Sequence, residues 1–235
     1  MKRIFVPTCG LSDWRNRLAD PEVQWERRAS AFETAVSWEL ATKTERGLPP
    51  KVVNLLDSQP ELRGARLIAA LPEHKVSLPG GSRASQNDVW ALLATENGLV
   101  SLAVEGKAGE PFGETLGDWL KEASPGKRKR LEYLMETLGV RTEPPSSVRY
   151  QLLHRTASAV LEARRCGALH AVMIVQSFRD DQTSEKDFTA FSELLGQTVH
   201  PNELKKVTSL GPQVLYLGWA KCDPASDAEI ALAAV

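Results

Sequence analysis

The chain has 235 residues, of which 42% are hydrophobic and 25% are charged, an ordinary composition for a globular protein with a sizeable core. Its formal net charge is −1, which excludes a chain that is basic as a whole. Nucleic acid would therefore have to be bound through a local basic groove.

The cysteine spacing and the lengths of the apolar segments indicate where in the cell the protein is expected. Cys9, Cys166 and Cys222 are odd in number and far apart, and they form neither a zinc spacing nor an obvious disulfide framework. We therefore expect a reducing, cytoplasmic location. No run of about 18 apolar residues is present, so we expect no membrane span. The first residues lack the apolar region of a signal peptide.

The N-terminal part of the chain begins with a predicted short strand, Lys2–Val6, and continues with a long helix. Asp20 and Pro21 are the residue types that cap and open a helix, which we expect to run to about Arg46. Its buried face is formed by apolar residues at helical spacing. These residues are Trp25, Ala29, Phe32, Val36 and Leu40, with Glu33 flanking them and Glu39 further round the helix.

A second, shorter pair of elements follows. Val52–Leu56 predicts a short helix, and Glu61–Leu71, whose apolar part is Arg66–Leu71, predicts a strand that Pro72 ends. The segment His74–Gln86 contains Pro79-Gly80-Gly81-Ser82, which is typical of a loop. This loop lacks the lysine-containing pattern of a phosphate-binding loop, so we interpret it as the connection that leads to Asp88.

A hairpin is the strongest prediction that the sequence offers. Two apolar runs, Val89–Ala94 and Leu99–Val104, are separated by a segment containing Asn97-Gly98, the strongest short hairpin signal. Leu, Val, Ala and Trp fill both runs, which suits strands buried on both faces. The second run ends in Glu105-Gly106-Lys107.

Charged side chains gather at the end of this hairpin. A turn centred near Asn97 places Asp88 across from about residue 106, within about 5–8 Å of Glu105 and Lys107. A slip of one residue would move Asp88 to the other face of the sheet. Two close carboxylates repel each other unless a cation lies between them. Mg²⁺, with Mn²⁺ as a substitute, would resolve this repulsion, and a neighbouring lysine could then act on a water molecule.

The C-terminal half alternates helices and strands. Glu114–Glu122 predicts a short helix, and the basic run Lys127–Arg130 either contacts phosphates or begins a solvated helix. Ser147–Arg165 predicts a long helix with one polar face, and Ala168–Phe178 predicts the clearest buried strand. The polar face holds Gln151, His154, Arg155 and Ser158, and the later elements are a helix at Glu185–Leu195 and a strand at Val214–Ala220.

This order of elements predicts an α/β fold with a central mixed β-sheet flanked by helices. We expect residues 1–235 to form a single domain. Its core would span about residues 21–178, and a helix and a strand at residues 179–222 would extend it.

Asp88 followed by Glu105-x-Lys107 at the end of a hydrophobic strand resembles the PD-(D/E)XK nuclease superfamily. The order of a helix, three antiparallel strands, a helix and a further strand is similar to that superfamily as well. Asn87 stands where the superfamily name places proline, a position that varies widely.

The resemblance implies a restriction-endonuclease-like core and metal-dependent phosphodiester hydrolysis. In this chain Asp88 and Glu105 would bind Mg²⁺, and Lys107 would act on the attacking water. An acidic residue of the first helix would assist, with Glu39 as the first candidate and Glu33 as the second. Gln151, next to Tyr150, resembles the glutamine or tyrosine that several branches carry near the site. Nucleic acid, with DNA favoured, would be the partner, and cutting both strands of a duplex would suggest a homodimer.

Two other interpretations remain open. In the first, the chain is a non-catalytic module that binds nucleic acid or protein, and Lys107 forms only a structural salt bridge with Glu105 or Asp88. In the second, Glu105 and another carboxylate form an acid/base pair like that of a glycosidase. Lys107 next to Glu105 would keep Glu105 ionised, which suits a general acid poorly.

Overall fold

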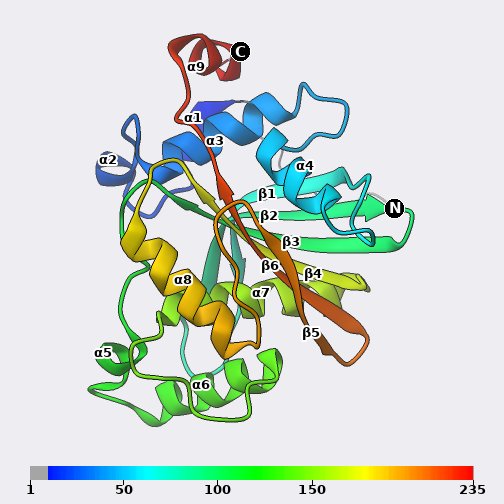
Figure 1. The fold of residues 1–235 in the computed structure, drawn as a ribbon. Coiled ribbons are helices and arrows are strands. Elements are labelled where there is room, and N and C mark those ends of the chain that lie inside the picture. Colours follow the sequence, from blue (N-terminus) through cyan, green and yellow to red (C-terminus); the bar gives the residue numbers. More distant parts are fainter. Residues whose placement is uncertain (1–9, 235) are drawn as a thin grey trace.

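The computed structural model describes residues 10–234, whose strands form a six-stranded sheet covered by helices on both faces (Figure 1). The predicted α/β class and central mixed sheet are confirmed. The strands are β1 (Arg66–Val76), β2 (Ser85–Thr95), β3 (Gly98–Lys107), β4 (His170–Ser177), β5 (Leu204–Leu210) and β6 (Gln213–Lys221). The helices are α1 (Leu11–Arg15), α2 (Pro21–Gln24), α3 (Ser30–Ala41), α4 (Pro50–Asp57), α5 (Leu116–Leu120), α6 (Pro125–Leu138), α7 (Tyr150–Cys166), α8 (Gln182–Leu194) and α9 (Asp227–Ala233).

The strand order is β1-β2-β3-β4-β6-β5. The first three strands are antiparallel neighbours, and β5 also runs antiparallel to β6. The central pairs β3–β4 and β4–β6 are parallel. Parallel strands need a crossover, and α7 lies in the one between β3 and β4. The carboxyl ends of β3, β4 and β6 therefore meet at one edge of the sheet.

Each face of the sheet carries its own hydrophobic core. On one face, α1, α3 and α4 pack on the sheet, and α9 packs on α3 (Figure 1). On the other face, α6, α7 and α8 pack against residues of β3, β4 and β6 (Figure 1). Every residue of β4 is buried, as expected for a central strand. Among residues 10–234, no helix is long and apolar enough to cross a bilayer.

The prediction of one long helix from Pro21 to about Arg46 was wrong, because the chain leaves helical geometry between α2 and α3. Arg28 has a φ of 67°, in the left-handed region. Glu33 holds this break: its Oε1 accepts the backbone N–H of Arg28 at 3.0 Å. Its Oε2 accepts the backbone N–H of Ala225 at 2.7 Å. Asp20 precedes α2 but makes no side-chain cap.

Pro72 does not end β1, as the sequence had indicated. The strand continues to Val76, and Pro72 is paired with Val89 of β2. This is possible because β1 is an edge strand, where a missing N–H can face away from the ladder. Strand β5 and helix α9 were not predicted, although β6 was. The strand expected at Lys2–Val6 lies outside the described residues.

Candidate active site

The predicted hairpin exists, and its register places Asp88 across from Glu105. The turn joins Thr95 to Gly98, which face each other in the ladder. The last pair in the ladder is Val89 with Val104, so the next position outward sets Asp88 opposite Glu105. This differs by one residue from the predicted partner at position 106. Residues directly opposite in a ladder lie on the same face, so the two carboxylates share one side of the sheet.

The predicted residues line one open pocket of about 670 Å³, here called the carboxylate pocket. It contains Asp88, Glu105, Lys107 and Gln151, four of the five site residues predicted from the sequence. The strands β2 and β3 supply the first three, and the first turn of α7 supplies Gln151. The hairpin and the crossover helix therefore converge at this end of the sheet.

Glu105 is the hub of a buried polar network. Its Oε1 accepts hydrogen bonds from Lys107 Nζ at 3.1 Å and from Gln151 Nε2 at 2.6 Å. Its Oε2 accepts a hydrogen bond from Arg155 Nε at 2.5 Å. The side chains of Glu105 and Lys107 are only 3% and 6% exposed, so both charges depend on these partners.

The network fixes the charge states of these groups. Burial alone would raise the pKa of Glu105, but the charges of Arg155 and Lys107 outweigh it and lower that pKa. Burial likewise opposes the charge of Lys107, but Glu105 and Asp88 reverse this and raise its pKa. Glu105 is therefore an anion and Lys107 a cation at neutral pH.

Asp88 differs from Glu105 because no cationic side chain of residues 10–234 lies within hydrogen-bonding distance of it. Its Oδ2 accepts the backbone N–H of Gly106 at 2.7 Å. Burial, followed by the negative charges of Glu105 and Glu73, raises the pKa of Asp88 well above its ordinary value. This carboxylate therefore lies where a cation would stabilise its ionised form.

Glu73 is a third carboxylate in the pocket, and it was not predicted. It lies in β1 between Pro72 and His74, which pair with Val89 and Asn87, so it stands opposite Asp88. Its Oε2 accepts a hydrogen bond from Gln86 Nε2 at 2.6 Å. Burial raises the pKa of Glu73 to about 7, although the Gln86 hydrogen bond opposes the shift.

The structure places neither acidic candidate of the first helix in the carboxylate pocket. Glu39, predicted as a catalytic and metal-binding residue, accepts a hydrogen bond from Trp14 Nε1 at 2.6 Å. Glu33 is 2% exposed and holds the backbone at Arg28 and Ala225. Glu39 therefore lies outside the carboxylate pocket, and the third carboxylate that lines this pocket is Glu73 of the edge strand β1.

Arg155 is the other pocket residue whose role the sequence did not indicate. It lies one turn after Gln151 on α7, and both were placed on the same polar face of that helix. That shared face was the available signal. The missing information was that the face turns toward the end of β3 rather than toward solvent.

The basic run Lys127–Arg130 has a partly structural use. Arg130 is 7% exposed, and its guanidinium donates to the backbone oxygens of Leu78, Pro79 and Gly81. It therefore holds the loop before β2. Lys127 Nζ donates to the backbone oxygen of Trp119 at 2.7 Å.

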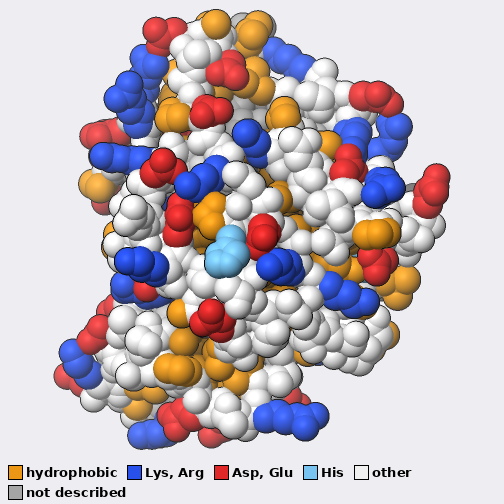
Figure 2. Space-filling view, in the orientation of Figure 1, with side chains coloured by type: hydrophobic (Ala, Val, Ile, Leu, Met, Phe, Trp, Pro, Cys, Tyr) orange, Lys and Arg blue, Asp and Glu red, His pale blue; other side chains and the backbone are white. Residues whose placement is uncertain are grey.

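Charge is mixed over the face that Figure 2 presents. Lys and Arg side chains alternate with Asp and Glu side chains, and no broad basic band crosses this view (Figure 2). This agrees with the formal net charge of −1.

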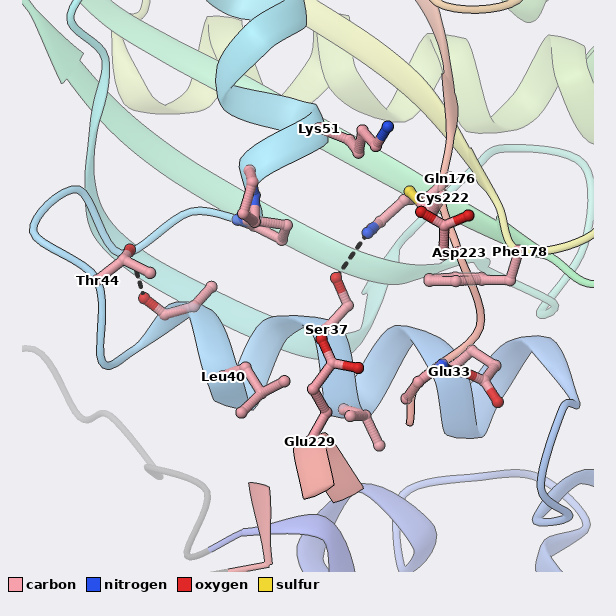
Figure 3. A pocket seen from close by; sticks show the side chains of 15 residues that line it. Glu33, Ser37, Leu40, Thr44, Lys51, Gln176, Phe178, Cys222, Asp223 and Glu229 are labelled. Atoms are coloured by element: carbon pink, nitrogen blue, oxygen red, sulfur yellow. Dashed lines mark hydrogen bonds between the residues drawn. The ribbon is translucent and has the colours of Figure 1, made fainter. Parts of the chain in front are cut away.

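Another pocket, here called the α3–α4 pocket, has a volume of about 310 Å³ and lies between α3, the start of α4 and the segment after β6. Gln176 Nε2 donates to Ser37 Oγ at 2.8 Å across it (Figure 3). Its charged side chains come from separate elements and include Lys51 and Asp223 (Figure 3). Of the site residues that the sequence predicted, Glu33, the second acidic candidate, lines this pocket.

The carboxylate pocket offers oxygen ligands of the kind that Mg²⁺ prefers. Asp88 Oδ1 and Glu73 Oε1 accept no hydrogen bond from residues 10–234, whereas both oxygens of Glu105 are engaged. One or two carboxylates with several waters are a usual Mg²⁺ site, so this donor set fits the ion. No group of three or more His, Cys, Asp or Glu side chains within the described range is arranged to hold a metal.

The chain belongs to the DUF6946 family, a domain of unknown function, which matches residues 7–224. No curated protein and no solved structure gives a significant match to it.

Proposed function

We propose that this member of the DUF6946 family is a metal-dependent nuclease that hydrolyses phosphodiester bonds in nucleic acid. The observation that carries the proposal is the placement of Asp88 opposite Glu105, with Lys107 hydrogen-bonded to Glu105 in an open pocket. The order α3, β1, β2, β3, α7 and β4 supports it, because it matches the order of elements that the PD-(D/E)XK resemblance implies.

Asp88 and Glu105 would hold Mg²⁺ or Mn²⁺, with Glu73 beside them. The bound ion would supply charge stabilisation at the phosphate and activation of a water molecule. The position of Asp88 supports this assignment, since its ionised form is disfavoured by burial and by two neighbouring carboxylates. Glu105 would bind the ion while Arg155 and Gln151 fix its orientation.

Lys107 would act as a charged group rather than as a base. Its raised pKa keeps the ammonium protonated, so it cannot accept a proton from water at neutral pH. A protonated Lys107 can orient the attacking water and stabilise negative charge that develops on the phosphate. Gln151 accepts a hydrogen bond from Lys107 Nζ at 3.4 Å and would support this orientation.

Glu73 is the group best suited to accept the proton of the water. It lines the same pocket, and its pKa of about 7 in the metal-free protein is near neutral pH, where a general base works best. Hydrolysis would then proceed by attack of the oriented water on phosphorus, with the proton passing to the Glu73 carboxylate and the ester oxygen leaving.

The test is a cleavage assay on plasmid DNA, single-stranded DNA and RNA with Mg²⁺ or Mn²⁺. Wild type is compared with Glu105→Gln, Lys107→Met and, as a matched control, Lys206→Met, which lies on β5 outside the pocket. We expect cleavage by wild type and the control, and a loss of about a hundredfold or more in Lys107→Met. Equal cleavage by wild type and Lys107→Met would contradict the proposal.

A non-catalytic binding module on the same fold is the second candidate. The observation that favours it is the engagement of both Glu105 oxygens by Lys107, Gln151 and Arg155. It predicts that no substrate is cleaved and that Lys107→Met lowers stability without changing any activity.

A further inference from the structure

A neighbouring cavity of about 420 Å³, here called the arginine pocket, is lined by three arginine residues. Its charged lining residues are Arg27, Arg28, Arg179 and Glu33. Glu33 is committed to the backbone, because its two oxygens accept the N–H groups of Arg28 and Ala225. Arg27 donates to Asp227 Oδ1 at 2.5 Å.

The other two guanidinium groups are available to a ligand. Within residues 10–234, Arg28 and Arg179 form no ion pair, and their guanidinium groups donate no hydrogen bond. Both side chains are exposed. The cavity is therefore lined by two arginines without an ion-pair partner among the described residues, while Asp227 pairs with Arg27 and the Glu33 carboxylate contributes one negative charge.

This pocket adjoins the carboxylate pocket. Arg28 lines both cavities. Arg179 lies against Gly109, a residue of the carboxylate pocket, because a Cβ at Gly109 would lie 3.1 Å from Arg179 Cδ. Ser30 and Ala31 at the N-terminus of the 12-residue helix α3 line the carboxylate pocket too, and a helix N-terminus favours negative charge.

The backbone at Arg28 adds a separate observation. Its φ of 67° is uncommon for a residue other than glycine, and such conformations persist only where the surrounding structure holds them. Glu33 supplies that restraint. The break between α2 and α3 thus presents the Arg28 side chain at the junction of the two cavities (the neighbouring Glu33 and Phe178 are labelled in Figure 3).

We propose that the arginine pocket binds a phosphate of the substrate strand adjacent to the phosphate that is hydrolysed. This inference rests on the proposed function, since it assigns the substrate a second phosphate next to the carboxylate pocket. Guanidinium groups suit phosphate because their planar donors can make two parallel hydrogen bonds to its oxygens. The substrate class is therefore an oligonucleotide or longer strand, rather than a single phosphate ester.

The test measures binding of a labelled 12-nucleotide single-stranded DNA by fluorescence anisotropy, in Ca²⁺ and over a range of salt. The variants are Arg28→Gly, which suits the positive φ and removes the guanidinium, and Arg179→Met. Arg141→Met is the control, because Arg141 is exposed and lines neither pocket. Thermal unfolding of each variant verifies that its fold is intact.

We expect Arg28→Gly and Arg179→Met each to weaken binding about tenfold. The slope of log affinity against log salt should fall by about 0.7 for each phosphate contact removed. Pyrophosphate should displace the strand, and poly-glutamate at equal charge should not. Unchanged binding in both variants, or equal displacement by poly-glutamate, would overturn the inference.

The outcomes also separate this inference from the proposed function. If wild type cleaves the substrate and both variants bind it unchanged, the proposed role of the arginine pocket is wrong and the proposed nuclease function still stands. Arginine-dependent binding of the strand without cleavage by wild type would remove the nuclease. It would also overturn the assignment of the bound phosphate as a neighbour of the scissile one.

Discussion

Arg155 Nε lies 2.5 Å from Glu105 Oε2 in the lining of the carboxylate pocket. This contact joins the crossover helix α7 to the end of strand β3. The side chains of the pair are 11% and 3% exposed. Removing one partner of a buried ion pair leaves the other charge without compensation. The pair therefore links the stability of the fold to the geometry of the candidate site.

We expect Arg155→Met to lower the free energy of unfolding by about 3 kcal/mol, because Glu105 would stay buried with less positive charge beside it. The double variant Arg155→Met/Glu105→Gln should recover most of this loss, since it removes both charges. Urea unfolding measures both values. A double variant that is no more stable than Arg155→Met would show that the pair is not the cause.

The raised pKa of Asp88 predicts a dependence of stability on pH in metal-free protein. The folded state binds this proton more tightly than the unfolded state, whose pKa is about 4. The contribution is therefore fully present below about pH 4 and is lost as pH rises through the raised pKa. Asp88→Asn, which can still accept the Gly106 N–H, should be more stable than wild type at pH 8 and should lose this advantage near pH 4.

Adding Mg²⁺ should reverse the order at pH 8. The ion would stabilise wild type by binding the ionised carboxylate and would add little to Asp88→Asn. Thermal unfolding at both pH values, with and without Mg²⁺, provides the comparison. Asp88→Asn that is less stable than metal-free wild type at pH 8 would contradict the account of this carboxylate.

Glu73 should control the acidic limb of the pH–rate profile. A general base must be ionised, so the rate of cleavage should rise with pH through the pKa of Glu73, which is about 7 in the metal-free protein and which a bound Mg²⁺ would lower. Glu73→Gln should slow cleavage about a hundredfold and abolish this limb. Glu39→Gln is the matched control, because Glu39 is bonded to Trp14 outside the pocket. If the pH–rate profile of Glu73→Gln kept its acidic limb, that limb would belong to another ionisable group.

Gly106, between Glu105 and Lys107, allows helix α3 to approach the end of β3. A Cβ at this position would lie 2.2 Å from Thr34 Oγ1 and 3.3 Å from the backbone oxygen of Ser30. Gly106→Ala should therefore destabilise the protein by about 1–3 kcal/mol and lower activity by displacing the site.

Thr34→Ala should partly rescue Gly106→Ala. Thr34 Oγ1 is buried and has no hydrogen-bond partner within the described part of the chain, so its removal alone should cost little stability. Denaturant unfolding of the two single variants and the double variant gives the coupling between them. Independent, additive effects of the two substitutions would show that the close approach is relieved in another way.

The sequence predicted those parts of the site that depend on local signals. Asn97-Gly98 set the hairpin, and Asp88, Glu105 and Lys107 followed from its strands. The break before α3 could not be predicted, because it depends on a hydrogen bond between Glu33 and Ala225, 192 residues apart. Glu73 was missed because Pro72 suggested the end of a strand, and only the edge position of β1 makes proline acceptable there.

The most direct test of the central claim is a calorimetric titration of the folded protein with Mn²⁺. Wild type is compared with Asp88→Asn and with Glu39→Gln, which leaves the pocket unchanged. The account predicts stoichiometric binding by wild type and Glu39→Gln, and a loss of binding by Asp88→Asn. Binding by Asp88→Asn equal to that of wild type, or an absence of binding by wild type, would contradict the claim that this pocket holds the catalytic ion.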